Sequence, residues 1–289
     1  MLSTAQRQAF DDAGYLVLPA FKPAAEIAAV RARAEAIVDA FEPAAGAGVF
    51  STRNQALTAD AALIASASQV HCFFEEEALA ADGALAVPKE RSINKIGHAL
   101  HDLDPVFERF SHGPELAALA ADLGLAQPRV WQSQLIFKQP AIGGEVRWHQ
   151  DATFFVTEPV SVTTFWFALE DAALDNGCLW VEPGGHRGAR GVLRERFVRE
   201  GERLRLEVLD RTPWPANAAA VPLPCEAGTL VVFHGLLPHY SAPNRSARRR
   251  LAYTLHATDG RSAYAPTNWL QRPASFPPRG FDADAAASV

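Results

Sequence analysis

The chain has 289 residues, of which 48% are hydrophobic and 21% are charged, and its formal net charge is −6. This length can bury a large core, and the composition is that of an ordinary globular protein. The negative charge argues against nucleic acid as a partner, because nucleic-acid binding requires a basic face.

The location of the protein is indicated by three further features. No apolar run approaches the roughly 18 residues that a membrane-spanning helix needs, and the first residues lack the pattern of a secretory signal. The three cysteines lie far apart and form no CxxC pair, which is typical of a reducing compartment. We therefore expect a cytoplasmic protein without a membrane partner.

Helical patterns dominate the first 128 residues. Ser3 and Gln6 resemble a capping box that opens a short helix. Apolar residues at spacings of three and four predict an amphipathic helix over 23–41. The other elements expected in this part are a strand over 15–18, a loop with short helical pieces over 43–66 and a helix over 114–123.

After residue 128 the sequence turns to β-branched and aromatic runs separated by glycine and proline. Such runs are typical of short strands, and helices followed by many strands predict a β-sandwich or barrel with helices outside it. Residues 188–222 are charged and predict an irregular insertion. Strands are expected over 129–138, 162–169, 178–182, 229–234 and 250–256.

No internal repeat or domain boundary is evident, so we expect one domain. It would comprise a mostly helical part over 1–128 that packs on a β core over 129–260, followed by a C-terminal extension over 261–289.

A candidate metal site begins with His149 and Asp151, two residues apart after a β-like run. On extended backbone, residues i and i+2 point to the same face, so both side chains can reach one ion. Two histidines and one carboxylate on one face of a metal form the ligand set of non-haem Fe(II) oxygenases. The pair alone is weak, because a histidine near an acid is more often a simple hydrogen-bonded pair.

His239 is the best third ligand, since a jelly roll places strands that are remote in sequence side by side. Arg250 follows at the start of a predicted strand. A buried arginine requires an anionic partner, and its planar fork suits a carboxylate. Ser241 lies two residues after His239 and can share its face. The chain thus offers metal ligands and a carboxylate-binding pair in the order that 2-oxoglutarate binding requires.

With these residues in place, the chain resembles the phytanoyl-CoA dioxygenase (PhyH) family. The resemblance extends from Gly14-Tyr15 to the last strand and is carried by several motifs in order. These are His149-Gln150-Asp151, Asn176-Gly177-Cys178-Leu179, Pro183-Gly184-Gly185-His186, and His239-Tyr240-Ser241-Ala242-Pro243-Asn244 with Arg250. Longer matching strings lie at 92–101, 136–140, 143–146 and 268–271.

The resemblance implies a mainly β fold with flanking helices around a double-stranded β-helix (jelly-roll, cupin-like) core. It implies Fe(II), 2-oxoglutarate as cosubstrate, and O2. By position, iron would be bound by His149, Asp151 and His239, and the distal carboxylate of 2-oxoglutarate by Arg250 and Ser241. Positions that line or approach the cosubstrate in relatives match Lys95, Gln134, Gln150 and Trp166.

The implied reaction is hydroxylation of an unidentified small molecule with release of succinate and CO2. The acid at Asp151 argues for hydroxylation, because halogenating relatives have a small residue there. Two alternatives remain open: a non-catalytic 2-oxoglutarate sensor, and a cupin-type metalloenzyme that would not need Arg250. Neither the prime substrate nor the oligomeric state can be inferred from the sequence.

Other aromatic and histidine residues have weaker signals. Core packing is the commoner role for residues that could also line a pocket, namely Trp148, Phe154, Phe155, His71, Phe73 and Phe74. Trp269 is expected at a pocket edge. His234 and His256 are expected in the core and His186 in a structural turn. His98 and His101 show no evident acid partner.

Overall fold

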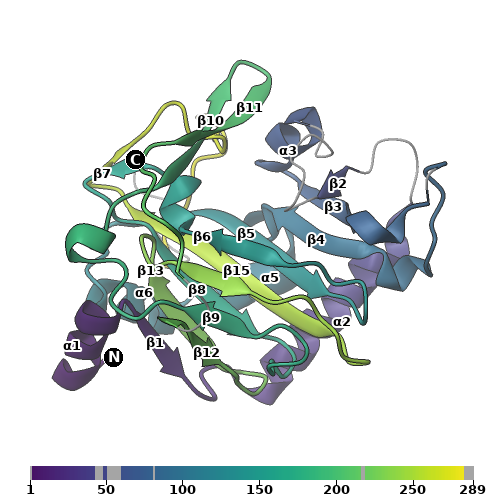
Figure 1. The fold of residues 1–289 in the computed structure, drawn as a ribbon, viewed down its shortest axis with the longest axis horizontal. Helices are drawn as coiled ribbons and strands as arrows, with labels where there is room; N and C mark the ends of the chain where they lie inside the picture. The colour runs from purple at the N-terminus through teal and green to yellow at the C-terminus, as the bar shows by residue number, and fades with distance from the viewer. Residues whose placement is uncertain (1, 43–47, 51–59, 81, 216–218, 283–289) are drawn as a thin grey trace.

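Two sheets packed face to face form the centre of the protein, with helices on the outer side of the larger one (Figure 1). The structure is a computed structural model, and it describes residues 2–42, 48–50, 60–80, 82–215 and 219–282. Within these ranges, no helix is both long and apolar enough to cross a membrane.

The larger sheet has eight strands, and long stretches of its pairing are antiparallel. In spatial order they are β1 (Tyr15–Leu18), β13 (Leu230–His234), β8 (Thr163–Ala168), β15 (Arg250–Asp259), β5 (Pro128–Lys138), β4 (Ile93–His98), β3 (Val70–Glu75) and β2 (Val49–Phe50). Strand β15 lies near the middle, between β8 and β5, and its Ala252 shares a core cluster with Val181 of the smaller sheet.

The smaller sheet covers this inner face. Its strands are β12 (Val221–Leu223), β9 (Leu179–Val181), β14 (His239–Ser241) and β6 (Val146–His149), in that order. Apolar side chains of both sheets meet between them, among them Phe233, Ala252, Val181 and Leu237. The arrangement confirms the predicted jelly-roll fold.

The helices pack apolar side chains against the outer side of the larger sheet, except for the helix that carries Leu63, which packs in a separate cluster with Phe197 and Leu236. Val30, Phe107 and Leu119 come from three helices and share one core with Leu135 and Tyr253 of the sheet. The helices are α1 (Thr4–Ala13), α2 (Ala24–Ala40), α3 (Asp60–Ser66), α4 (Leu100–Leu103), α5 (Pro105–Ser111) and α6 (Pro114–Asp122). The predicted capping box of α1 is present, since Ser3 and Gln6 bond reciprocally.

Most predicted elements agree with the structure to within a few residues. The α-helices of the described residues all lie within the first 128 residues, and β1 to β4 of the same part join the large sheet, where β4 pairs directly with β5. One prediction was wrong. The charged segment 188–222 is not irregular throughout. It contains a regular hairpin of β10 (Glu195–Glu200) and β11 (Arg203–Val208) that projects beyond the sheets in Figure 1.

The remaining elements are short. They are the 3-10 turns η2 (Glu76–Ala78), η3 (Lys89–Arg91), η4 (Asp151–Thr153) and η5 (Gly188–Arg190), and the paired strands β7 (Thr157–Glu158) and β16 (Ala263–Tyr264). Of the loop predicted over 43–66, residues 43–47 and 51–59 lie outside the described residues, and the remainder includes β2 and α3.

Candidate metal centre and cosubstrate pocket

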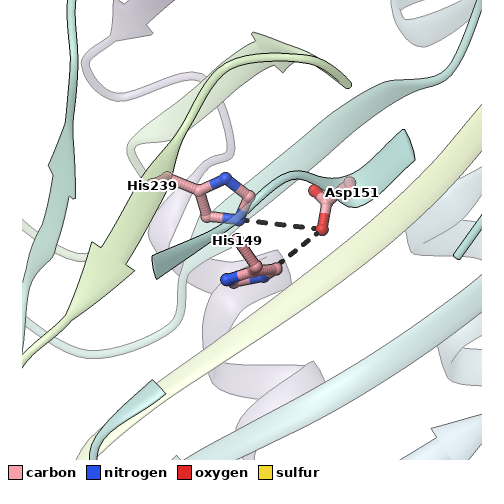
Figure 2. A group of neighbouring side chains, drawn as sticks. All are labelled: His149, Asp151 and His239. Atoms are coloured by element: carbon pink, nitrogen blue, oxygen red, sulfur yellow. Dashed lines mark ion pairs between the residues drawn. The ribbon is translucent and has the colours of Figure 1, made fainter. Parts of the chain in front are cut away.

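His149, Asp151 and His239 meet between the sheets, as Figure 2 shows. His149 ends β6 and His239 begins β14, and the two are direct partners in the antiparallel register. Asp151 Oδ1 lies 3.6 Å from His149 Nε2 and 3.7 Å from His239 Nε2. Ligand atoms on one face of an octahedral ion lie about 3 Å apart when the bonds are about 2.1 Å long. The three side chains therefore fit one ion.

Both imidazoles are held in the orientation that metal binding needs. His149 Nδ1 lies 2.8 Å from the Arg147 carbonyl, and His239 Nδ1 lies 3.0 Å from the Leu237 carbonyl. A carbonyl only accepts, so each Nδ1 carries the proton and each Nε2 presents its lone pair to the cluster. Burial lowers the pKa of His239 to about 4, so its imidazole is neutral at physiological pH.

Asp151 is the acidic member of the cluster and is almost fully buried. Burial alone would raise its pKa, but the neighbouring imidazoles of His239 and His256 hold the pKa well below the ordinary value. The carboxylate therefore stays ionised across the physiological range, as a metal ligand must.

Gln150 lies between two of the cluster residues but points away from them. Its amide donates to the carbonyls of Val192 and Leu236, 2.9 Å away in each case, and its Oε1 accepts from the Arg194 backbone. The predicted contact of Gln150 with the cosubstrate is wrong, because alternation on extended backbone sends residue 150 to the opposite face.

Arg250 begins β15 and is buried beside the cluster, only 1% exposed. Its Nη2 donates to the Ser241 hydroxyl at 3.3 Å, and its Cζ lies 5.7 Å from the Trp166 ring centroid. Its Nε and Nη1 have no hydrogen-bond partner among the described residues. Burial lowers the pKa of Arg250 to about 10, so it remains a cation at neutral pH. A buried cation with open donors fits a carboxylate ligand.

Ser241 supports this guanidinium in a way that the sequence did not predict. Its hydroxyl donates to the Gly177 carbonyl at 2.9 Å while it accepts from Arg250. Lys138 lies nearby and donates to the carbonyls of Gly144 and Ser241. Burial, and then the nearby charge of Arg250, lower the pKa of Lys138 well below its usual value. The end of the pocket at Arg250 is electropositive because the guanidinium itself stays charged.

A cavity of about 800 Å³ joins the cluster and Arg250. Lys95, Gln134 and Trp166, predicted to approach the cosubstrate, all line it. Desolvation lowers the pKa of Lys95 to about 7, although the Asp151 charge opposes this shift. Gln134 Oε1 is buried and has no hydrogen-bond partner in the described part of the chain. Open polar atoms on a cavity wall are expected where a polar ligand binds.

The sequence analysis missed the part of the outer cavity wall that the β10–β11 hairpin supplies, namely Phe197, Leu204 and Leu206. The outer wall is apolar and comes largely from this hairpin and from the two residues that follow η4. The residues that form it are Phe154, Phe155, Phe197, Leu204, Leu206, Leu63 and Trp269. The alternation of Leu204, Leu206 and Val208 with charged residues, after the turn at Gly201, is a strand signal that was available in the sequence.

The structure also places the weaker candidates. Phe154, Phe155 and Trp269 line the cavity, whereas Trp148 stacks on Tyr240 instead. His256 is buried as predicted but also lines the cavity, with its Nε2 3.5 Å from Asp151 Oδ2. His101 does have an acid partner, since its Nε2 lies 3.0 Å from Asp102 Oδ2.

Fold and site together define the class of protein: a jelly-roll protein with the two-histidine, one-carboxylate ligand set of non-haem Fe(II) oxygenases. The chain belongs to the phytanoyl-CoA dioxygenase (PhyH) family, whose profile matches residues 10–252. It is 44% identical to "Phytanoyl-CoA dioxygenase 1" of Oryza sativa subsp. japonica over 96% of each chain. It is 43% identical to "Phytanoyl-CoA dioxygenase domain-containing protein 1" of Bos taurus, over 96% of this chain and 97% of that one.

A solved structure with the same fold is the non-heme alpha ketoglutarate dependent carbocyclase SnoK from nogalamycin biosynthesis. It superposes with a TM-score of 0.65 at 21% identity, over 92% of this chain and 88% of that one. At this identity the likeness establishes the fold.

Proposed function

We propose that the protein hydroxylates a small molecule in a reaction that converts 2-oxoglutarate and O2 to succinate and CO2. The observation that carries this proposal is the juxtaposition of two features in one cavity. One is the cluster of His149, Asp151 and His239. The other is the buried guanidinium of Arg250, which forms no ion pair with an acidic side chain of the described residues. The cluster would hold iron, and Arg250 would hold the distal carboxylate of 2-oxoglutarate.

Bound iron and 2-oxoglutarate would supply the means to split O2, with one oxygen atom going to succinate and the other to a C–H bond of the substrate. The chain's own residues contribute binding and orientation. The carbonyls behind His149 and His239 fix the imidazole tautomers. Ser241 orients the Arg250 fork as a hydrogen-bond acceptor.

Three further residues are proposed to contact the cosubstrate because they line the same cavity: Lys95, Gln134 and Trp166. Lys95 offers a cation near Asp151, and the Trp166 ring packs beside the Arg250 guanidinium. The apolar wall of the hairpin would seat the substrate and exclude water from the reacting atoms.

The test is succinate formation by the purified protein from 2-oxoglutarate, with and without Fe(II). We expect iron-dependent succinate, and we expect His149→Ala to abolish it. Arg250→Ala should also lose it, while Arg249→Ala is the matched control, because Arg249 pairs with Glu170 outside the cavity. Absence of Fe(II) and 2-oxoglutarate binding would contradict the proposal.

The same assay separates the alternatives. A sensor would bind 2-oxoglutarate without forming succinate across a broad substrate panel. A cupin-type metalloenzyme would keep its activity in Arg250→Ala. We further propose that the chain acts as one domain in the cytoplasm, which is supported by the β4–β5 pairing and by three free cysteines.

A further inference from the structure

The two oxygens of Asp151 lie in different surroundings. Oδ1 faces His149 and His239, whereas Oδ2 faces two side chains of the large sheet. Thr164 Oγ1 donates to Oδ2 at 2.5 Å, and His256 Nε2 lies 3.5 Å from the same oxygen. A hydroxyl has one proton to donate, so the Thr164 proton is committed to Oδ2.

Thr164 and His256 are held by two paired strands of the large sheet. Thr164 is on β8 and His256 on β15, and they are direct partners in the antiparallel register. Both are buried. Their side chains therefore lie next to each other on the inner face of the large sheet, opposite the strands that supply the histidine ligands.

His256 is itself held in one orientation. The Gln132 amide lies 3.2 Å from His256 Nδ1, and the ring stacks on Phe155 at 5.0 Å between centroids with 23° between planes. Because the amide nitrogen only donates, Nδ1 accepts and the proton is on Nε2. The protonated nitrogen thus faces Asp151 Oδ2.

The backbone alone does not decide which carboxylate oxygen faces the ion. The amide of Ala152 donates to the Gly235 carbonyl at 2.9 Å, which fixes the chain beside Asp151 but leaves its side-chain torsions open. The two contacts of Oδ2 limit that freedom, because a rotated carboxylate would lose the Thr164 hydrogen bond and the close approach of His256 Nε2.

We propose that Thr164 and His256 are positioning residues that reserve Oδ2 of Asp151 for hydrogen bonding and so make Asp151 a one-oxygen metal ligand. The inference rests on the proposed function, since it assumes that this cluster binds metal. Its consequence is that the carboxylate occupies one coordination position, which leaves the others for the cosubstrate and O2.

The test is the metal affinity of the apoprotein, measured by titration with Co(II) without 2-oxoglutarate. Thr164→Val keeps the β-branched shape but removes the donor, and we expect the affinity to fall about 10- to 100-fold, as for other partners of metal ligands. Thr164→Ser restores the hydroxyl and should recover most of the affinity. The matched control is Thr163→Val, the same change at a buried neighbour on the opposite face of β8.

A merely structural role for Thr164 would lower the melting temperature of the apoprotein and leave the Co(II) affinity of the folded fraction unchanged. If Thr164→Val does not fold, the Co(II) affinity of His256→Phe is measured instead, because this variant keeps the stacked ring and removes the Nε2 donor, together with the Nδ1 atom that accepts from Gln132. Affinity equal to the wild type in the folded variant overturns the inference and leaves the proposed function intact. If the wild type binds no Co(II), both are overturned.

Discussion

Two buried arginines, Arg250 and Arg272, differ in how their charge is balanced. The Arg272 side chain is fully buried, and its Nη1 lies 3.1 Å from Asp102 Oδ2. Arg250 is equally inaccessible, but no acidic side chain among the described residues forms an ion pair with it. Burying a charge is costly, and Asp102 offsets that cost for Arg272 within the chain.

The surroundings of Arg272 form a closed network that we call the Asp102 cluster: Asp102, His101, Arg272 and Arg279. Arg279 Nε lies 2.8 Å from Asp102 Oδ1, and its Nη2 donates to the His101 carbonyl. The network ties the C-terminal segment to α4. The comparison teaches that a buried charge with an internal partner serves the fold, whereas one without a partner marks a place for a ligand.

The largest expected effect concerns the Asp102 cluster. Asp102→Asn keeps the shape but leaves two arginines without their shared carboxylate, so we expect a loss of about 3–5 kcal/mol in the free energy of unfolding. Urea denaturation measures it. Asp175→Asn is the control, because Asp175 pairs with Arg248 at the exposed surface and should matter little.

The Asp102 contribution also has a pH dependence with a definite sign. Burial alone would raise its pKa, but the hydrogen bond from His101 and then the nearby arginines hold the pKa below the ordinary value of 3.8. Its contribution to stability is therefore present above pH 3.8 and is lost as the pH falls below that value. Equal stability of Asp102→Asn and the wild type at pH 7 would contradict the structural role.

Arg250→Met should weaken the binding of 2-oxoglutarate without lowering stability, which is the opposite of the effect expected for Asp102→Asn. Loss of the partner of a buried carboxylate costs about 2–5 kcal/mol in binding, a rise of about 30-fold or more in the Kd of 2-oxoglutarate. The free energy of unfolding should not fall, because methionine replaces an unpaired charge in an apolar setting. Calorimetric titration with Mn(II) in place of iron measures the Kd, with Arg249→Met as the control. Unchanged affinity together with lower stability would make Arg250 a structural residue like Arg272.

The smallest expected effect concerns Lys95, a partly buried lysine on the cavity wall. Burial lowers the pKa of Lys95 to about 7 in the free protein. If its cation contacts 2-oxoglutarate, the affinity is highest below pH 7 and falls as the pH rises above it, by at most about tenfold per pH unit. Titrations between pH 6.5 and 8.5 avoid the pKa of His239, which is about 4. Lys95→Met should flatten the profile, and an unchanged slope would remove Lys95 from the cosubstrate site.

The parts of the site that could be predicted from the sequence depend on local rules. His149 and Asp151 are two residues apart on extended backbone, so alternation alone brings them to one face. His239 and Arg250 followed from the chemistry that a metal and a dicarboxylate require. The same alternation rule excludes Gln150 from that face. The sequence analysis nevertheless placed Gln150 near the cosubstrate, because it followed the resemblance to relatives.

The parts that could not be predicted depend on contacts between strands remote in sequence. Thr164 and His256 meet Asp151 only because β8 and β15 pair in one particular register. The local sequence of either strand does not show that register, because it is set by the pairing of two strands that lie far apart in the chain. The helix α5 and the strands β3 and β4 were missed for a related reason, because their short apolar runs carry no clear period.

Gln150 links the hairpin wall of the pocket to the metal ligands His149 and Asp151. Its side chain bonds to the backbone of Val192 and Arg194, directly before the hairpin, while its own backbone joins His149 to Asp151. One residue thus connects the wall that would seat a substrate with two ligands of the ion. By thermodynamic reciprocity, a substrate that changes the metal affinity must have its own affinity changed by the metal by the same factor.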